Sequence, residues 1–184
     1  MKNKMLIILL LITGFCESQS VINSSKLEYQ KAIKSNNFVK DKNVKVYKDR
    51  LVLGKNYALK NNYSDEDFFE YKYLGSFGDS YKYIVIEKED YNGSVFFVIN
   101  RDKNFLKYEI PGKPYLFEDF VVTVNIESTT DNKNILCFFK TNEAQKVFKK
   151  INLPEGIIVQ EIRLLDCNIY INDINNKFWK IKIK

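Results

Sequence analysis

Hydrophobic and polar residues alternate along several short segments of the chain. In residues 119–126, Phe120, Val122, Val124 and Ile126 fall on one face of an extended strand, and polar side chains such as Thr123 fall on the other. This period of two predicts a strand with one buried face.

Two further segments have the same pattern, and one interruption differs. In residues 105–110, Leu106, Tyr108 and Ile110 are expected to face inward. Near the end, Trp179, Ile181 and Ile183 alternate with lysines, which is typical of an edge strand protected against pairing with another chain. Residues 64–67 read Ser-Asp-Glu-Asp, a capping-box pattern that predicts a short helix.

Strand–turn–strand units recur along the chain, in residues 96–110, 135–151 and 169–183. Strands expected near 81 and 120 are 39 residues apart (120 − 81), and those near 95 and 135 are 40 apart (135 − 95). We therefore predict an all-β fold of antiparallel hairpin repeats of about 40 residues, forming incomplete or propeller-like blades. The alternative is a two-sheet β-sandwich or a barrel.

Three short motifs carry a resemblance to known proteins. Tyr-Leu-Gly at 73–75, Phe-Val-Ile-Asn at 97–100 and Gly-Lys-Pro-Tyr-Leu at 112–116 resemble exported bacterial proteins of the Bacteroidetes type with propeller-like repeats. The resemblance covers residues 71–171. Such repeats often carry a Ser-Pro-Asp-Gly turn, whereas residues 117–120 read Phe-Glu-Asp-Phe. The resemblance implies blades and no catalytic residues.

The N-terminus has the three parts of an export signal. Lys2 and Lys4 precede an apolar run over residues 5–12, which is shorter than the ~20 residues of a membrane span. We predict a signal peptide over 1–18, no transmembrane span in the mature chain, and a periplasmic or extracellular location. The alternative is a lipoprotein tethered through Cys16, although Phe15 before it fits that processing poorly.

The mature chain divides into two parts. Residues 19–42 are polar, and Ser24 or Ser25 could cap a short helix reaching Ile33. Residues 43–184 are expected to form a single all-β domain. Cys137 and Cys167 remain after cleavage, and the sequence leaves open whether they are bridged.

The net charge of +6 and the absence of histidine limit the chemistry. A positive field favours an anionic partner, such as an acidic protein or an envelope polysaccharide, unless it reflects only a solvated lysine-rich surface. Nucleic acid is not expected, because no basic helix or binding motif is present. Histidine-based catalysis is excluded, zinc is disfavoured, and neither a P-loop nor a dinucleotide fingerprint occurs, so no cofactor is expected.

Carboxylates remain as candidate catalytic groups. They cluster at Asp65, Glu66 and Asp67, at Glu87, Glu89 and Asp90, and at Glu118 and Asp119. A pair of such acids would suffice for a glycoside hydrolase, but each cluster lies where a turn or strand end is expected. Calcium could bind through Asn172, Asp173, Asn175 and Asn176, although a polar hairpin turn explains that segment better.

Tyrosines near turns are the candidate contacts with a partner, namely Tyr57, Tyr63, Tyr91 and Tyr115. The alternative is a purely structural role, in which these rings fill the core. The leading hypothesis is an exported, non-catalytic binding protein of the bacterial envelope or exterior. The alternatives are an immunity or inhibitor protein against a secreted toxin or hydrolase, and a carboxylate-dependent glycoside hydrolase.

Overall fold

The computed structural model describes residues 20–126, 134–144 and 146–183. The chain is all-β, with four antiparallel sheets that we number in chain order and, within these residues, no closed barrel. Sheet I contains β3 (Lys45–Val46), β4 (Arg50–Gly54) and β5 (Tyr57–Lys60). Sheet II contains β6 (Phe69–Phe77), β7 (Tyr83–Asp90), β8 (Gly93–Asn100) and β9 (Leu106–Ile110).

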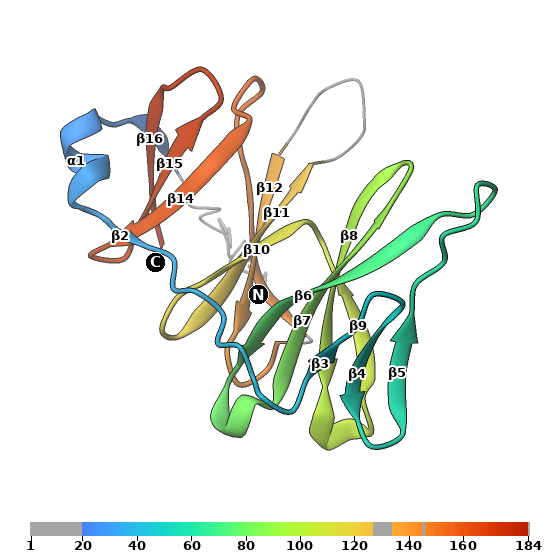
Figure 1. The fold of residues 1–184 in the computed structure, drawn as a ribbon. Coiled ribbons are helices and arrows are strands. Elements are labelled where there is room, and N and C mark those ends of the chain that lie inside the picture. The colour runs from blue at the N-terminus through green and yellow to red at the C-terminus, as the bar shows by residue number, and fades with distance from the viewer. Residues whose placement is uncertain (1–19, 127–133, 145, 184) are drawn as a thin grey trace, which may run out of the picture.

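Sheets III and IV complete the arrangement (Figure 1). Sheet III contains β10 (Lys113–Leu116), β11 (Phe120–Ile126), β12 (Asn134–Lys140) and β13 (Val147–Asn152). Sheet IV has the order β1 (Val21–Asn23), β16 (Phe178–Lys182), β15 (Asn168–Asp173), β14 (Val159–Leu165) and β2 (Ile33–Lys34). The short helices are α1 (Lys26–Lys31), η1 (Asp79–Tyr81) and η2 (Arg101–Lys103).

The four sheets pack face to face in the order I, II, III, IV. One apolar cluster joins sheets I and II, for example Leu53 with Ile99. A second joins sheets II and III, including Val85 and Cys137, and a third joins sheets III and IV, including Phe138. Sheets II and III are therefore covered on both faces, which explains why their strands contain long apolar runs such as residues 83–86.

Coverage on both faces corrects one expectation. Thr123 was expected to face solvent, but it is fully buried on the side of sheet III that faces sheet II. The alternation seen in β11 is real, since Val122 and Val124 contact sheet IV. The opposite face of sheet III is covered by sheet II and is therefore not exposed to water.

Two other expectations about single strands are also wrong. Leu106 is 48% exposed because Phe105, at φ +57°, turns its ring into the cluster between sheets I and II. The last strand is not an edge, because β16 lies between β15 and β1 in sheet IV. Its Lys180 ammonium lies over the ring of Tyr170, 5.4 Å from the centroid.

The N-terminal part of the described chain pairs with strands of the sheets. Ser25 and Glu28 form the capping box of α1, which confirms a short helix at this place, and α1 packs on the outer face of sheet IV through Tyr29. The predicted extent to Ile33 is wrong, because the helix ends at Lys31 and Ile33 begins β2. No helix in the described part of the chain has the length and apolar character needed to cross a bilayer.

Residues 33–44, which we call the strap, then pair in turn with one strand of each of three sheets, β14, β10 and β6 (Figure 1). Ile33 pairs with β14, the Asn36 N–H donates to the Leu116 carbonyl at 2.6 Å, and Val39 pairs with Ser76 of β6. Gly75 permits this approach, because a Cβ there would lie 2.5 Å from the Phe38 Cβ. The strap ties sheets IV, III and II together.

The segment at 64–67 is a loop and not a helix. Asn62 and Phe69 exchange two backbone hydrogen bonds of 2.9 Å, which close the loop between β5 and β6. Only six residues lie between these two positions, so a helix has no room to extend. The Ser64 hydroxyl still accepts the Asp67 N–H at 3.3 Å.

The three predicted hairpins are present, with turns after β8, β12 and β15, while the 40-residue repeat stays a prediction. The strands expected to correspond, near 81 and 120 and near 95 and 135, are the second and third strands of sheets II and III. The all-β class is confirmed, and the propeller-like interpretation stays a prediction.

Candidate ligand-binding groove

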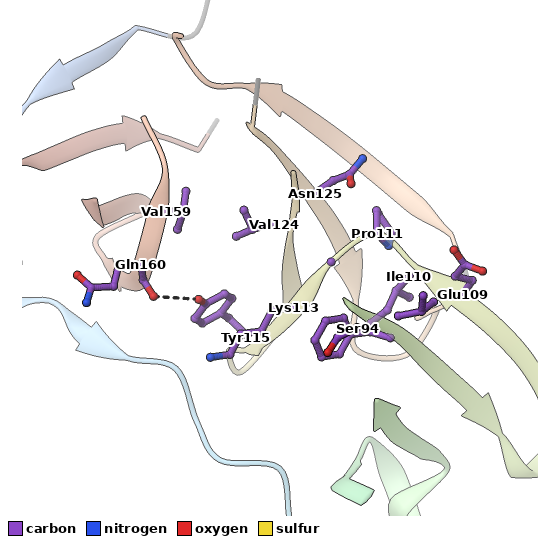
Figure 2. Close-up of a pocket in the computed structure, with 13 residues that line it drawn as sticks. Ser94, Glu109, Ile110, Pro111, Lys113, Tyr115, Val124, Asn125, Val159 and Gln160 are labelled. Atoms are coloured by element: carbon purple, nitrogen blue, oxygen red, sulfur yellow. Dashed lines mark hydrogen bonds between the residues drawn. The ribbon is translucent and has the colours of Figure 1, made fainter. Parts of the chain in front are cut away.

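Two adjoining cavities open where sheet II diverges from sheet III and the strap. The first has a volume of about 630 Å³ and lies among β8, β9, β10, β11 and the start of β14 (Figure 2). The second has a volume of about 740 Å³ and lies among the strap, β6, β7, β8 and β10. Phe96, Lys113 and Tyr115 line both cavities, and we call the two adjoining cavities together the groove.

Strand β10 provides the inner wall of the groove. Gly112 directly precedes this strand at φ +79°, and a Cβ there would lie 1.6 Å from the Val124 carbonyl oxygen. Only glycine therefore allows the chain to turn from β9 into β10 so close to β11. This turn sets Lys113 and Tyr115 on the same face of β10, and the Lys113 ammonium lies 5.7 Å from the Tyr115 ring centroid.

The Tyr115 side chain is nearly buried, and a hydrogen bond fixes the position of its hydroxyl. The hydroxyl donates to the backbone carbonyl of Gln160 at 3.3 Å, which connects sheet III to sheet IV at the groove (Figure 2). Burial, and secondarily the negative charge of Glu161, raises the pKa of Tyr115 above its ordinary value. The ring is thus neutral at ordinary pH and offers an apolar surface.

The opposite wall comes from sheet II. Phe96 is half-buried, and next to it the Ser94 hydroxyl donates to a carboxylate oxygen of Glu87 at 2.6 Å. Glu109, on β9, lines the first cavity. Phe96 therefore lies among polar groups that are already partly hydrogen-bonded.

The strap supplies the third wall with amide side chains. Asn36 and Asn37 are exposed and line the second cavity. Lys40 also lines it, but its ammonium donates to the carbonyls of Tyr73 and Leu74 at 2.8 and 2.9 Å. These two bonds fix the strap against β6 and use much of the hydrogen-bonding capacity of Lys40.

A second feature is a cluster of aromatic rings at the ends of two hairpins. Phe68 lies between Tyr63 and Tyr91, with ring centroids 6.0 and 5.4 Å away. Tyr63 is 48% exposed and Tyr91 67% exposed. The loop at 63–68 is anchored where the Tyr91 hydroxyl donates to the Asp65 carbonyl at 3.3 Å. We call Tyr63, Phe68 and Tyr91 the aromatic tip.

The four predicted tyrosines therefore separate into different environments. Tyr63 and Tyr91 are exposed and come together through Phe68. Tyr57 is half-buried and stacks on Phe105 at 4.9 Å, so it is part of the core between sheets I and II. Tyr115 is only 9% exposed, so its expected accessibility is wrong, although its ring lines the groove. Cys16 lies outside the described residues.

The carboxylate clusters do not converge. Asp65, Glu66 and Asp67 are exposed in the loop between β5 and β6. Glu89 forms an ion pair with Lys72, and Asp90 lies 3.9 Å from Lys88. The exposed Glu118 and Asp119 belong to the turn between β10 and β11. Glu87 is the member of these clusters that lines the groove.

The structure gives a different role to the segment that could bind calcium. The Asp173 carboxylate is buried and accepts hydrogen bonds from the backbone N–H groups of Asn175 and Lys177 and from the Trp179 indole, each at 2.9 Å. These bonds organise the turn between β15 and β16. Among the described residues, no group of three or more His, Cys, Asp or Glu side chains could hold a metal ion.

The two cysteines are not bridged. Cys137 is buried and Cys167 is exposed in a turn of sheet IV, and both are free. Burial raises the pKa of the Cys137 thiol.

Sequence reasoning missed most of the groove. It found Tyr115 but not Phe96, Lys113 or the strap asparagines, because the groove is made by segments distant in the chain. One local signal was present: Pro111-Gly112 marks a tight turn, and Pro114 two residues later is typical of an edge strand.

No protein family, curated protein or solved structure matches the chain.

Proposed function

We propose that the protein is an exported, non-catalytic binding protein of the bacterial envelope or exterior that holds its ligand in the groove. The groove is the observation that carries this proposal. Its two cavities, about 630 and 740 Å³, are each within the usual size of ligand pockets, roughly 300–1,000 Å³. Aromatic surface with a few placed polar groups is the usual lining of such pockets.

The distribution of acids supports binding over hydrolysis. A glycosidase needs two carboxylates across one scissile bond. Most acids of the predicted clusters are solvated or paired with lysines outside the groove, as Glu89 is with Lys72. Two acids do line the groove, but in different cavities: Glu87 lines the second and accepts the Ser94 hydroxyl, and Glu109 lines the first.

The test is co-sedimentation of the mature chain with insoluble cell-envelope material. We expect the wild type to sediment with the envelope, and Ser94→Trp, which places a large ring in the first cavity next to Phe96, to remain in solution. Asn152→Trp is the matched control, since it adds the same ring at an exposed position of β13 outside the groove. Equal sedimentation of both variants, or none by the wild type, would contradict the proposal.

The same samples test for catalysis. Soluble reducing sugar released by the wild type and lost in Glu87→Gln would identify a hydrolase and would overturn the non-catalytic assignment.

The aromatic tip supports a second candidate function, inhibition of a secreted toxin or hydrolase. Exposed tyrosines on protruding loops are typical of the residues that dominate protein interfaces. The three neighbouring acids, Asp65, Glu66 and Asp67, fit a basic partner surface. Calorimetry against the product of an adjacent toxin or hydrolase gene should detect binding that Tyr63→Ala/Tyr91→Ala abolishes and Ser94→Trp leaves intact.

A further inference from the structure

The charges of the groove are balanced. Lys40 and Lys113 line it with Glu87 and Glu109, two positive groups against two negative ones. Lys40 is bonded to backbone carbonyls, and Glu87 accepts the Ser94 hydroxyl. Lys113 and Glu109 remain as one exposed charge of each sign. An anionic polymer would meet little net attraction here, despite the +6 charge of the whole chain.

The uncharged lining combines flat apolar rings with amides. Phe96 is half-buried and offers ring surface, whereas Tyr115 lines the groove with only 9% of its surface exposed. Asn36 and Asn37 from the strap and Asn125 from β11 offer side-chain amides, each of which both donates and accepts hydrogen bonds. Gln160 of β14 also lines the groove, but its amide oxygen already accepts the Asn172 side-chain amide at 3.2 Å. A sugar ring has the matching chemistry: a C–H face that loses contact with water on an aromatic ring, and hydroxyls that both donate and accept.

The backbone of β10 argues against the other extended ligand, a peptide strand. The Leu116 carbonyl points away from β11, toward Asn36 of the strap. Because residues two apart point the same way, the next position on this open edge is Pro114. Proline has no N–H, so the edge cannot supply the continuous donor and acceptor row that strand addition needs.

We propose that the groove binds a neutral oligosaccharide, with a sugar ring against Phe96 and its hydroxyls bonded by the strap amides of Asn36 and Asn37. This inference rests on the proposed function and names the ligand class of the same site. Phe96 lines both cavities, so a sugar ring held against it would lie next to both.

The test is titration of the mature chain with soluble hexasaccharides, followed by intrinsic fluorescence and calorimetry. The neutral probes are hexamers of glucose in α-1,4 and β-1,4 linkage and of N-acetylglucosamine; the anionic probe is a hexamer of galacturonic acid. We expect at least one neutral probe to bind, with an affinity that changes less than about two-fold between low and high salt, because no ion pair contributes.

Two variants locate the binding. Phe96→Ala should weaken it about ten-fold, the upper range for one aromatic contact. Phe148→Ala is the matched control, since Phe148 is 46% exposed on β13 outside the groove. Because Phe96 also packs against the core, Asn37→Ala provides a second test at an exposed strap position and should weaken binding several-fold with the thermal midpoint unchanged.

The outcomes separate the two proposals. Binding of the anionic hexamer alone, with salt sensitivity and loss in Lys113→Gln, would overturn the neutral-sugar inference and leave a groove-binding protein. Binding of no hexamer by a chain that sediments with envelope in a groove-dependent way would also overturn the sugar inference alone. Failure of both experiments would overturn the proposed function itself.

Discussion

Asp41 of the strap and Arg101 of η2 form an ion pair beneath the strap, between a carboxylate oxygen and a guanidinium nitrogen. The Asp41 side chain is 3% exposed and that of Arg101 18% exposed. Asp41 also accepts the Asn43 N–H at 2.9 Å, and its own N–H donates to the Tyr73 hydroxyl at 2.9 Å. This network holds the strap where it forms a wall of the groove.

Removing the Asp41 charge should destabilise the protein strongly. Asp41→Asn leaves Arg101 buried without its partner, which typically costs about 3 kcal/mol or more. The matched control is Asp102→Asn, because Asp102 is 66% exposed and pairs with Lys82 at 3.7 Å on the surface. Its cost should stay below about 1 kcal/mol. Urea unfolding of both variants measures the difference, and similar midpoints would show that the buried pair contributes little.

The same carboxylate predicts a dependence of stability on pH. Burial acts to raise the pKa of Asp41, but the hydrogen bond from Asn43 and the charge of Arg101 outweigh it, so the folded pKa lies below the ordinary 3.8. A lowered folded pKa gives stability that is present above the unfolded pKa and lost as pH falls through the folded one. The unfolding free energy should therefore decline below about pH 4. Asp41→Asn should flatten this decline; an equally steep decline in the variant would exclude Asp41 as its source.

A substitution at Gly112 tests whether the turn into β10 requires glycine. Gly112→Ala adds a Cβ at a site where backbone lies 1.6 Å away, so we expect the chain to misfold or lose several kcal/mol. Gly156→Ala is the control, because its φ of +82° is almost the same as the +79° of Gly112 but nothing lies within 4 Å. It should cost about 1 kcal/mol, the penalty for a left-handed conformation alone. Equal losses, measured by thermal unfolding, would mean that β10 can shift to accept the extra atom.

The local pattern of the sequence predicted much of the strand content. Strand β11 has the predicted bounds because Val122 and Val124 alternate with polar residues, and alternation reflects the backbone directly. The same pattern could not show that Thr123 is buried, because its cover comes from another sheet. The capping pattern at Ser64 likewise predicted a helix that the nearby pairing of Asn62 with Phe69 excludes.

The groove was less predictable for a related reason. Its walls come from the strap, from Phe96 of β8 and from Tyr115 of β10, and no local pattern reports that these segments meet. From the sequence, the strap was assigned to a polar N-terminal segment ahead of the domain, because Asn36 and Asn37 are polar and carry no strand pattern. Its position is determined by isolated bridges to Leu116 and Ser76, each of which depends on the completed sheets.

The environments of Cys137 and Cys167 predict unequal reactivity of the two thiols. In the chain that begins at Gln19, Cys167 should react rapidly with a thiol reagent because it is exposed. Cys137 should react only on unfolding, since it is buried and burial raises its pKa. Absorbance titration should therefore give one thiol in the native protein and two in denaturant. Two fast thiols would show that the interface between sheets II and III opens readily, and none in denaturant would reveal a bridge.

Strand β1 sets a limit on where the predicted signal peptide could be cut. Val21 pairs with Ile181 and packs in the apolar cluster between sheets III and IV, and Asn23 pairs with Trp179. Cleavage after Ser18 leaves this strand intact, and so does lipidation of Cys16. Mass spectrometry of the exported protein should find Gln19 at the N-terminus, while a diacylated Cys16 would establish the lipoprotein alternative.

A chain that begins at Ser24 should be less stable than one that begins at Gln19 by about 2–3 kcal/mol, because it loses the burial of Val21 and the backbone pairing of β1. The removed strand would also leave β16 as the edge of sheet IV, so this chain should associate at concentrations where the longer one stays monomeric. Unfolding and light scattering of both chains test this. Equal stability and equal size would mean that β1 is dispensable and that the cleavage site is not limited by the fold.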